Sequence, residues 1–331
     1  MPPSPKLVKP LKEAKKTWTK KDRLMVLALL LATILPAAFL SLRSQDYTLP
    51  SIAMFHFSSP FSSSSNQIIY ELNPVTPTPT PTPPPALDEF HQLVQNLKGD
   101  YGFYVYRLNA KYEYGSNYER IFTAASLIKL PVLISLYQAS ENGTINLDEV
   151  YSLKPEDKVP GAGSLQSAPI GTQKTYRELA QAMAKSSDNT ALRIITRKLG
   201  ITTINQTVSQ IGMVNTSYSD NTTTPKDIGL LFQKLYQNRL LKPENKNELI
   251  DFLTKTDWED RIPAGIPQDI KVAHKIGTEA GVWSDAGIVF SSPPFILVIV
   301  TENALENEAL AVIPQIAQAV YSTEQKTLIK P

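Results

Sequence analysis

The chain has 331 residues, with 33 basic and 31 acidic side chains, three histidines and no cysteine. The absence of cysteine excludes a disulfide scaffold, a thiolate metal site, a cysteine nucleophile and a lipid-modified cysteine anchor. Because His56, His91 and His274 are the only histidines, we expect a serine enzyme of this sequence to use a base other than the histidine of a Ser-His-Asp triad.

Positive charge gathers at the N-terminus. Residues 1–23 carry eight basic and two acidic side chains, a net charge of +6, so the remaining residues sum to −4. This basic tail precedes Leu24–Leu42, nineteen residues without a charge, which is long enough to span a bilayer. The positive-inside rule predicts a single-pass protein of the cytoplasmic membrane, with the N-terminus inside and the remainder outside. A cleaved signal peptide is the alternative, and the length of the segment favours an uncleaved anchor.

Residues 43–85 are rich in Ser, Thr and Pro and end in the run TPTPTPTPPP, which is typical of an extended spacer. The composition then becomes globular, and residues 86–331 are enough for one large hydrophobic core. Since the basic excess belongs to the tail, this part gives no support to a nucleic-acid partner. We expect a monomer.

The spacing of apolar residues predicts mixed secondary structure in this globular part. In chain order, the pattern indicates a helix at 86–98, a strand at 101–109 with a second short strand after a turn, helices at 126–140, 176–199, 203–212 and 225–241, strands at 269–277, 282–291 and 294–302, and a helix at 306–321. The predicted fold is α/β of the α+β kind. An antiparallel sheet is built from both chain ends and flanked by helices, with an all-helical insert between them.

The segment FTAASLIKLPVL, at 122–133, is the most informative for chemistry. Ser126 and Lys129 stand three residues apart at a predicted helix start, so both side chains share one face. The helix dipole and the apolar neighbours disfavour the charged form of Lys129, and a neutral lysine can act as a general base for a serine. An S-x-x-K pair alone also fits an ordinary helix start with a solvent-exposed lysine.

Two further motifs follow in the chain. Ser187, Asp188 and Asn189 precede a predicted helix, and Lys275-Ile276-Gly277 ends a predicted strand. The order S-x-x-K, S-D-N and K-x-G resembles the class A β-lactamases and the wider group of penicillin-recognising serine enzymes, over about residues 88–321.

The resemblance implies catalytic roles for three residues. Ser126 is the expected nucleophile, Lys129 takes part in its deprotonation, and Ser187 relays a proton to the leaving nitrogen. No metal and no cofactor is expected. Asp188 is expected to organise its loop, and His274 to be a packed or hydrogen-bonded histidine.

The resemblance also implies a binding surface. Asn189 is expected to hold the side-chain amide of the substrate, and Lys275, Gly277 and Thr278 to bind near its carboxylate. The backbone N–H groups of Ser126 and Thr278 are the expected oxyanion hole.

Two departures from the family pattern affect the predicted mechanism. Ile276 stands where the family has a Thr or Ser hydroxyl, which removes a donor to the substrate carboxylate. The loop at 212–225 is about a dozen residues shorter than expected and has no glutamate to activate the hydrolytic water. Asp220 is the only acid in it. We therefore expect an enzyme that is acylated by β-lactams and deacylates slowly.

Three interpretations remain open at this point. The first is a membrane-anchored serine hydrolase of the class A type, acting on β-lactams or similar amides. The second is a D-Ala-D-Ala peptidase, a penicillin-binding protein acting on peptidoglycan. The third is a non-catalytic binding module, for which Ile276 is the main support and against which the intact Ser126, Lys129, Ser187 and Asn189 argue.

Overall fold

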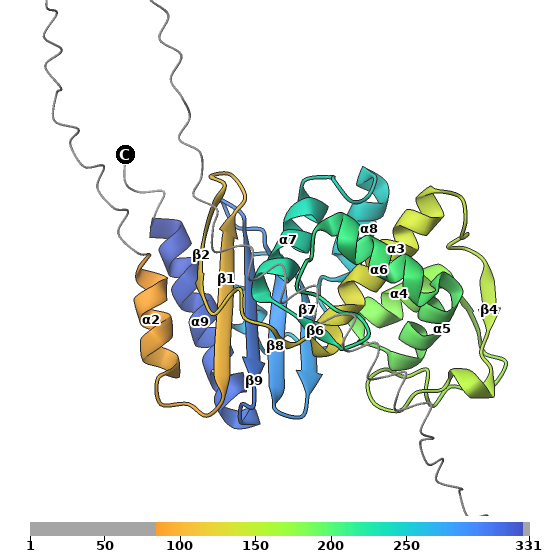
Figure 1. The fold of residues 1–331 in the computed structure, drawn as a ribbon, viewed down its shortest axis with the longest axis horizontal. Helices are drawn as coiled ribbons and strands as arrows, with labels where there is room; N and C mark the ends of the chain where they lie inside the picture. Colours follow the sequence, from red (N-terminus) through yellow and green to blue (C-terminus); the bar gives the residue numbers. More distant parts are fainter. Residues whose placement is uncertain (1–83, 327–331) are drawn as a thin grey trace, which may run out of the picture. The chain divides into compact units, whose positions relative to one another are not determined.

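The computed structural model describes residues 84–326 (Figure 1). The basic tail, the predicted anchor Leu24–Leu42 and almost all of the Ser/Thr/Pro-rich segment lie outside the described residues. Within residues 84–326, no helix combines the length and the apolar character that crossing a membrane requires.

A five-stranded sheet, antiparallel throughout, forms the centre of the described part, in the order β2-β1-β9-β8-β7. Its strands are β1 (Asp100–Arg107), β2 (Tyr112–Ser116), β7 (Val272–Glu279), β8 (Val282–Val289) and β9 (Phe295–Glu302). The first two strands come from the start of the globular part and the last three from its end. The predicted sheet built from both ends of the domain is therefore confirmed.

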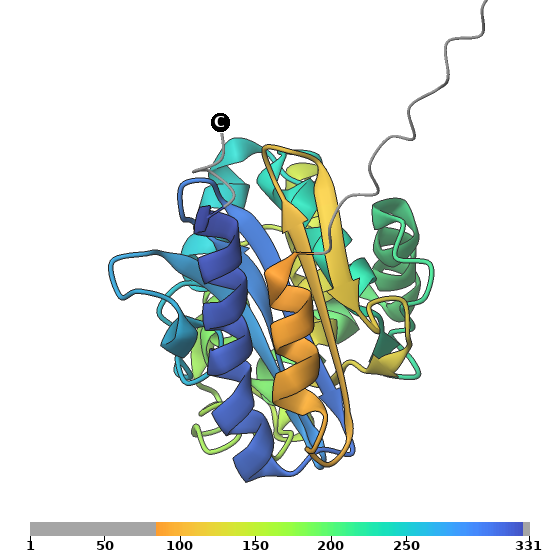
Figure 2. The ribbon, with the colours of Figure 1, turned by 90° about the vertical axis from the view of Figure 1, so that its left-hand side faces the viewer.

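The central strand β9 is buried on both faces. Leu297 and Ile299 pack with helices α2 (Pro85–Val94) and α9 (Glu306–Lys326), which lie side by side over one face (Figure 2). Val298 and Val300 point to the other face and join the core of the helical region. This alternation explains why the strand reads as an uninterrupted apolar run.

The helical region lies on the other side of the sheet (Figure 1). It contains α3 (Lys129–Glu141), α4 (Tyr176–Lys185), α5 (Asn189–Leu199), α6 (Ile201–Ile211), α7 (Pro225–Tyr236) and α8 (Pro243–Phe252). Helix α3 is buried on almost every side, which is typical of the central helix of a bundle. Short pairs of strands complete the region: β3 (Phe122–Thr123) with β6 (Thr222–Thr223), and β4 (Val150–Ser152) with β5 (Gln173–Thr175).

Two features of this region differ from the predicted elements. The pattern over 176–199 is two helices, because Ser187 adopts a left-handed conformation (φ 51°) and Asp188 starts a new helix. Helix α8 was not predicted, because its sequence PENKNELIDF is mostly polar and has little apolar periodicity.

Candidate active site

Ser126 lies in a short 3-10 helix, η1 (Ala125–Ile128), directly before α3. Residues three apart in a 3-10 helix stand one above the other, so Lys129 reaches back over Ser126. The distance from Lys129 Nζ to Ser126 Oγ is 3.1 Å. The first hydrogen bond of this turn runs from Leu127 N to Ala124 O at 3.0 Å. The backbone N–H of Ser126 precedes it and is therefore one of the N-terminal N–H groups that the helix does not use.

Lys129 is the centre of the polar network. Its side chain is 2% exposed, and Nζ also contacts the Ser187 carbonyl oxygen (2.5 Å), Ser187 Oγ (3.1 Å) and Asn189 Oδ1 (2.7 Å). Burial lowers its pKa to about 8, against a weaker opposing effect of the Asp188 charge. An ammonium has three protons for these four contacts, whereas a neutral amine can accept the Ser126 proton. The structure thus brings together Ser126, Lys129, Ser187 and Asn189.

The S-D-N turn is held from both sides. Asp188 accepts from Ala191 N and from Leu165 N, both at 2.9 Å, so it caps α5 and ties down the loop that precedes α4. A Cβ at Gly163 (φ 93°) would lie 2.1 Å from the Asp188 carboxylate, so this loop needs glycine there. Asp188 therefore organises the loop.

Strand β7 approaches η1 closely at Gly277. A Cβ there would lie 2.9 Å from Ala124 O and 3.1 Å from Leu127 Cγ, so a larger residue would push the strand away from the Ser126 turn. Lys275 is 1% exposed, and burial together with repulsion from Lys129 places its pKa well below the ordinary value. Repulsion between the two lysines therefore disfavours a positive charge on both at once.

His274 points away from the cleft into a polar cluster. Its Nδ1 lies 2.8 Å from Asp285 Oδ1, and its Nε2 lies 3.1 Å from Glu259 Oε1. Burial alone would lower the pKa of His274, but the two carboxylates outweigh it and raise the pKa to about 9. The imidazolium links the loop that carries Glu259 to strand β7, which agrees with a structural role.

A cleft of about 720 Å³ opens at the nucleophile. Ser126, Lys129, Asn189 and Thr278 line it, together with residues that the sequence had not singled out: Ala125, Ile128, Gly161, Ala162, Leu192, Ile201, Tyr218, Ser219, Asn221 and Glu279. Among these lining residues, Glu279 has the only carboxylate, which accepts from Asn221 Nδ2 at 3.2 Å. Asp220 is not among them, and its carboxylate accepts from Ser217 Oγ at 2.7 Å.

Arg261 is a functional candidate that the sequence did not reveal. It is 2% exposed, and its Nη2 donates to Thr278 Oγ1 at 2.6 Å, while Nη1 donates to the carbonyls of Gly277 (3.2 Å) and Ser284 (2.6 Å). The Thr278 hydroxyl accepts from Arg261, so its own proton is free to point into the cleft. No local motif marks Arg261, because it comes from an irregular segment well before β7.

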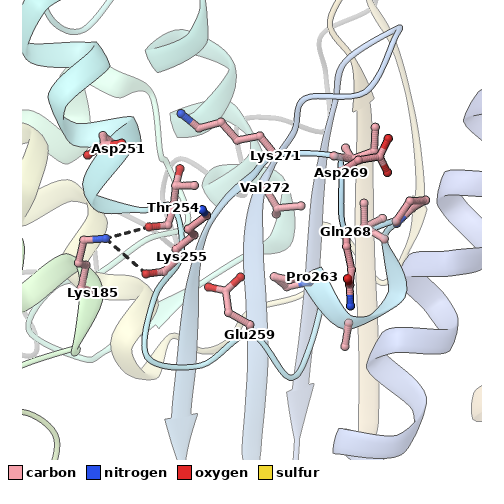
Figure 3. Close-up of a pocket in the computed structure, with 14 residues that line it drawn as sticks. Lys185, Asp251, Thr254, Lys255, Glu259, Pro263, Gln268, Asp269, Lys271 and Val272 are labelled. Atoms are coloured by element: carbon pink, nitrogen blue, oxygen red, sulfur yellow. Dashed lines mark hydrogen bonds between the residues drawn. The ribbon is translucent and has the colours of Figure 1, made fainter.

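A larger cavity, of about 940 Å³, lies apart from these groups. It is bounded by the end of α8 and by the segment from 254 to 272, and none of the motif residues lines it (Figure 3). Lys185, which precedes the S-D-N turn, donates here to the carbonyls of Thr254 (2.9 Å) and Lys255 (3.3 Å). This cavity is larger than the cleft, but Ser126 and Lys129 line the cleft and not this cavity.

Comparison with known proteins identifies the family. The Beta-lactamase enzyme family matches residues 86–323. A beta-lactamase of Mycobacterium tuberculosis is 26% identical over 247 residues, which cover 66% of this chain and 77% of the relative.

Solved structures show the same architecture. The structure of PBP-A is 28% identical with a TM-score of 0.69, covering 73% of this chain and 96% of that chain. A mutant of PBP-A, solved as an acyl-enzyme complex with penicillin G, has the same identity of 28% and TM-score of 0.69, and covers 74% of this chain and 100% of the mutant's. An ancestral class A β-lactamase is 21% identical with a TM-score of 0.67, covers 72% and 99% of the two chains, and shares the fold. The family match spans most of the chain and includes all three motifs, and on this ground the chain belongs to the beta-lactamase family of serine hydrolases.

Proposed function

We propose that the protein is a membrane-anchored serine hydrolase of the class A β-lactamase type that forms an acyl-enzyme on Ser126 with β-lactams or related amides and releases it slowly. The observation that carries this proposal is the contact of Lys129 Nζ with Ser126 Oγ at 3.1 Å, with a lysine pKa lowered to about 8. A lysine with this pKa is partly neutral at neutral pH and can take the serine proton.

The acylation step follows from the contacts of Lys129. Ser126 Oγ attacks the carbonyl carbon of the substrate while its proton passes to Lys129 Nζ. The C–N bond then breaks, and Ser187 Oγ, 3.1 Å from Nζ, gives its proton to the leaving nitrogen and takes the proton of Lys129. The products are an ester on Ser126 and a free amine, with the lysine neutral again.

The cleft residues and strand β7 position the substrate. The N–H groups of Ser126 and Thr278 stabilise the oxyanion in this scheme, and Asn189 holds the acyl-side amide. Lys275 provides positive charge once the substrate carboxylate has bound, and Gly277 lets β7 come close to the nucleophile. The intact set argues against a mere binding module.

Arg261 and Thr278 together replace the donor that is missing at Ile276. The guanidinium holds the Thr278 hydroxyl at 2.6 Å and directs its proton to the carboxylate of the substrate. Losing a charge-assisted hydrogen bond of this kind costs about 1.5–3 kcal/mol.

The variant Arg261→Gln is expected to lower the acylation rate constant for penicillin G by about 10- to 100-fold. The reason is weaker recognition of the substrate carboxylate. The acylation rate constant for penicillin G methyl ester, which lacks that carboxylate, should therefore fall much less. The measurement is the ratio of the rate constants for acid and ester, which a general loss of folded protein does not change. An unchanged ratio would contradict the assignment of Arg261.

Slow deacylation follows from the absence of a placed base. In the described cleft, Glu279 is the only carboxylate, and it sits beside Thr278 and binds Asn221. Asp220 is exposed and does not line the cleft. The hydrolytic water therefore lacks a carboxylate base that could take its proton as Lys129 takes the proton of Ser126.

A D-Ala-D-Ala peptidase is the second candidate. The absence of a glutamate from the loop at 212–225 and the anchor predicted at Leu24–Leu42 favour it. The two candidates share the acylation chemistry and differ in the acyl donor. Release of D-alanine from a peptide ending in D-Ala-D-Ala, compared with opening of a penicillin, separates them.

The anchor belongs to the same proposal. The support is the uncharged segment Leu24–Leu42 behind a tail of net charge +6, which predicts a catalytic domain outside the cytoplasmic membrane.

One experiment tests acylation and location together. Intact cells that produce the full chain are treated with a fluorescent penicillin and then fractionated. We expect a labelled band of 36.7 kDa in the membrane fraction, absent after pre-incubation with unlabelled penicillin G. Absence of label would contradict the acyl-enzyme, and label confined to the soluble fraction would contradict the anchor.

A further inference from the structure

A second cavity continues the active-site cleft along helix α5. Its volume is about 660 Å³, and it shares with the cleft of about 720 Å³ the lining residues Asn189, Leu192, Ile201 and Tyr218. Because the same side chains border both volumes, the two form one groove that leads away from Ser126.

The wall of this second cavity is apolar near the cleft. Leu192 and Tyr218 are partly exposed, and Ile201 is 50% exposed, which is unusual for a large apolar side chain. The Tyr218 hydroxyl is satisfied by Thr196 Oγ1 at 2.9 Å, so the ring is held in place and presents its apolar body. Concave sites with apolar walls and few polar groups are typical of ligand subsites.

The far part of the cavity carries an arginine that makes no ion pair among the described residues. Arg197 is neutralised by Asp157, at 2.5 Å from Nη2 to Oδ1. Arg193 is exposed, and its Nη1 donates to the backbone carbonyl of Glu156 at 3.1 Å. Within residues 84–326, Arg193 has no carboxylate in an ion pair.

The helix sets the spacing between the two ends of the groove. Asn189 and Arg193 are four residues apart on α5, so they lie on one face, about 6 Å apart along the axis. An extended acyl chain as long as two residues spans roughly 7 Å. An arm that starts at the amide held by Asn189 therefore reaches the Arg193 guanidinium.

We propose that this groove is an acyl-arm subsite for amide substrates whose acyl group carries an apolar stretch that ends in a carboxylate, with Arg193 as the anion partner. The proposal rests on the proposed function, because the arm belongs to the acyl group that is transferred to Ser126. It adds a substrate class: anionic acyl donors are preferred to neutral ones of the same length.

Two penicillins test the subsite on the full chain. Both carry a six-carbon acyl arm on 6-aminopenicillanic acid, which ends in a carboxylate in one compound and in a carboxamide in the other. The second-order rate constant for acylation of Ser126 is measured for each by intact mass. We expect the carboxylate compound to react about fivefold faster at low salt, and the ratio to approach one at about 1 M salt.

Two arginine variants assign the preference. In Arg193→Gln the ratio of the two rate constants should fall to about one, whereas in the matched control Arg239→Gln it should stay as in the parent protein. Arg239 is also exposed, and it lines neither the active-site cleft nor the cavity along α5. A ratio of one in the parent, or a ratio that survives in Arg193→Gln, would overturn the subsite. Failure of both compounds and of penicillin G to acylate the protein would overturn the proposed function itself.

Discussion

Replacing Lys129 by methionine is expected to slow the acylation of Ser126 by penicillin G by about 10²–10⁴-fold. Methionine keeps the volume of the side chain but cannot accept the serine proton, and among the described residues no other base is hydrogen-bonded to Ser126 Oγ. The measurement is the rate of appearance of the adduct by rapid mixing and intact mass.

The pH profile identifies Lys129 as the base. With a pKa of about 8, its neutral fraction grows by about eightfold from pH 7 to pH 8.5, so the acylation rate should rise by the same factor. The sign follows from the chemistry, because the deprotonated amine is the active form. The residual rate of Lys129→Met should stay flat over this range.

A control separates chemistry from folding. Lys242→Met changes an exposed lysine that lines neither the active-site cleft nor the cavity along α5. It should leave the acylation rate and the pH profile unchanged. The melting temperature of Lys129→Met is expected to fall by a few degrees, because the Ser187 carbonyl and Asn189 Oδ1 lose their buried donor, so the rates are compared at a temperature at which both proteins are folded. A pH profile in Lys129→Met that still rises as in the parent would assign the base elsewhere.

Deacylation is expected to be slower by about 10²–10⁴-fold than in an enzyme that has a general base for this step. A typical turnover of about 10 s⁻¹ then becomes about 0.1 to 0.001 s⁻¹, so the adduct should persist for roughly 10 to 1,000 s. The Glu279→Gln variant should have the same adduct lifetime as the parent, because its carboxylate is engaged with Asn221 beside the oxyanion site. A much longer lifetime in that variant would make Glu279 the base.

The sequence was sufficient to predict the pairing of Ser126 with Lys129, because that pairing depends on local helix geometry. It was also sufficient for the sheet, since β7, β8 and β9 are apolar runs close enough in the chain to pair antiparallel. The break between α4 and α5 carried a signal as well. Asp188 followed by a helical pattern is typical of a helix start, and the left-handed Ser187 before it is visible only in the structure.

The rest of the site depends on contacts between distant segments. Arg261 reaches Thr278 from an irregular segment, so no periodicity or spacing could connect the two. Tyr218 and Ile201 come together only because the loop between α6 and α7 folds back over α5. The groove at Arg193 is therefore a property of the packed domain, and the sequence alone showed only that the loop is short.

The lifetime of the Ser126 adduct tests the central claim most directly. The purified full chain is mixed with penicillin G, excess antibiotic is removed, and intact mass is followed over time beside the Ser126→Ala variant. We predict a mass increase of one penicillin that decays over roughly 10 to 1,000 s and never forms in Ser126→Ala. Rapid multiple turnover of penicillin without a detectable adduct, or an adduct that forms equally in Ser126→Ala, would contradict the account.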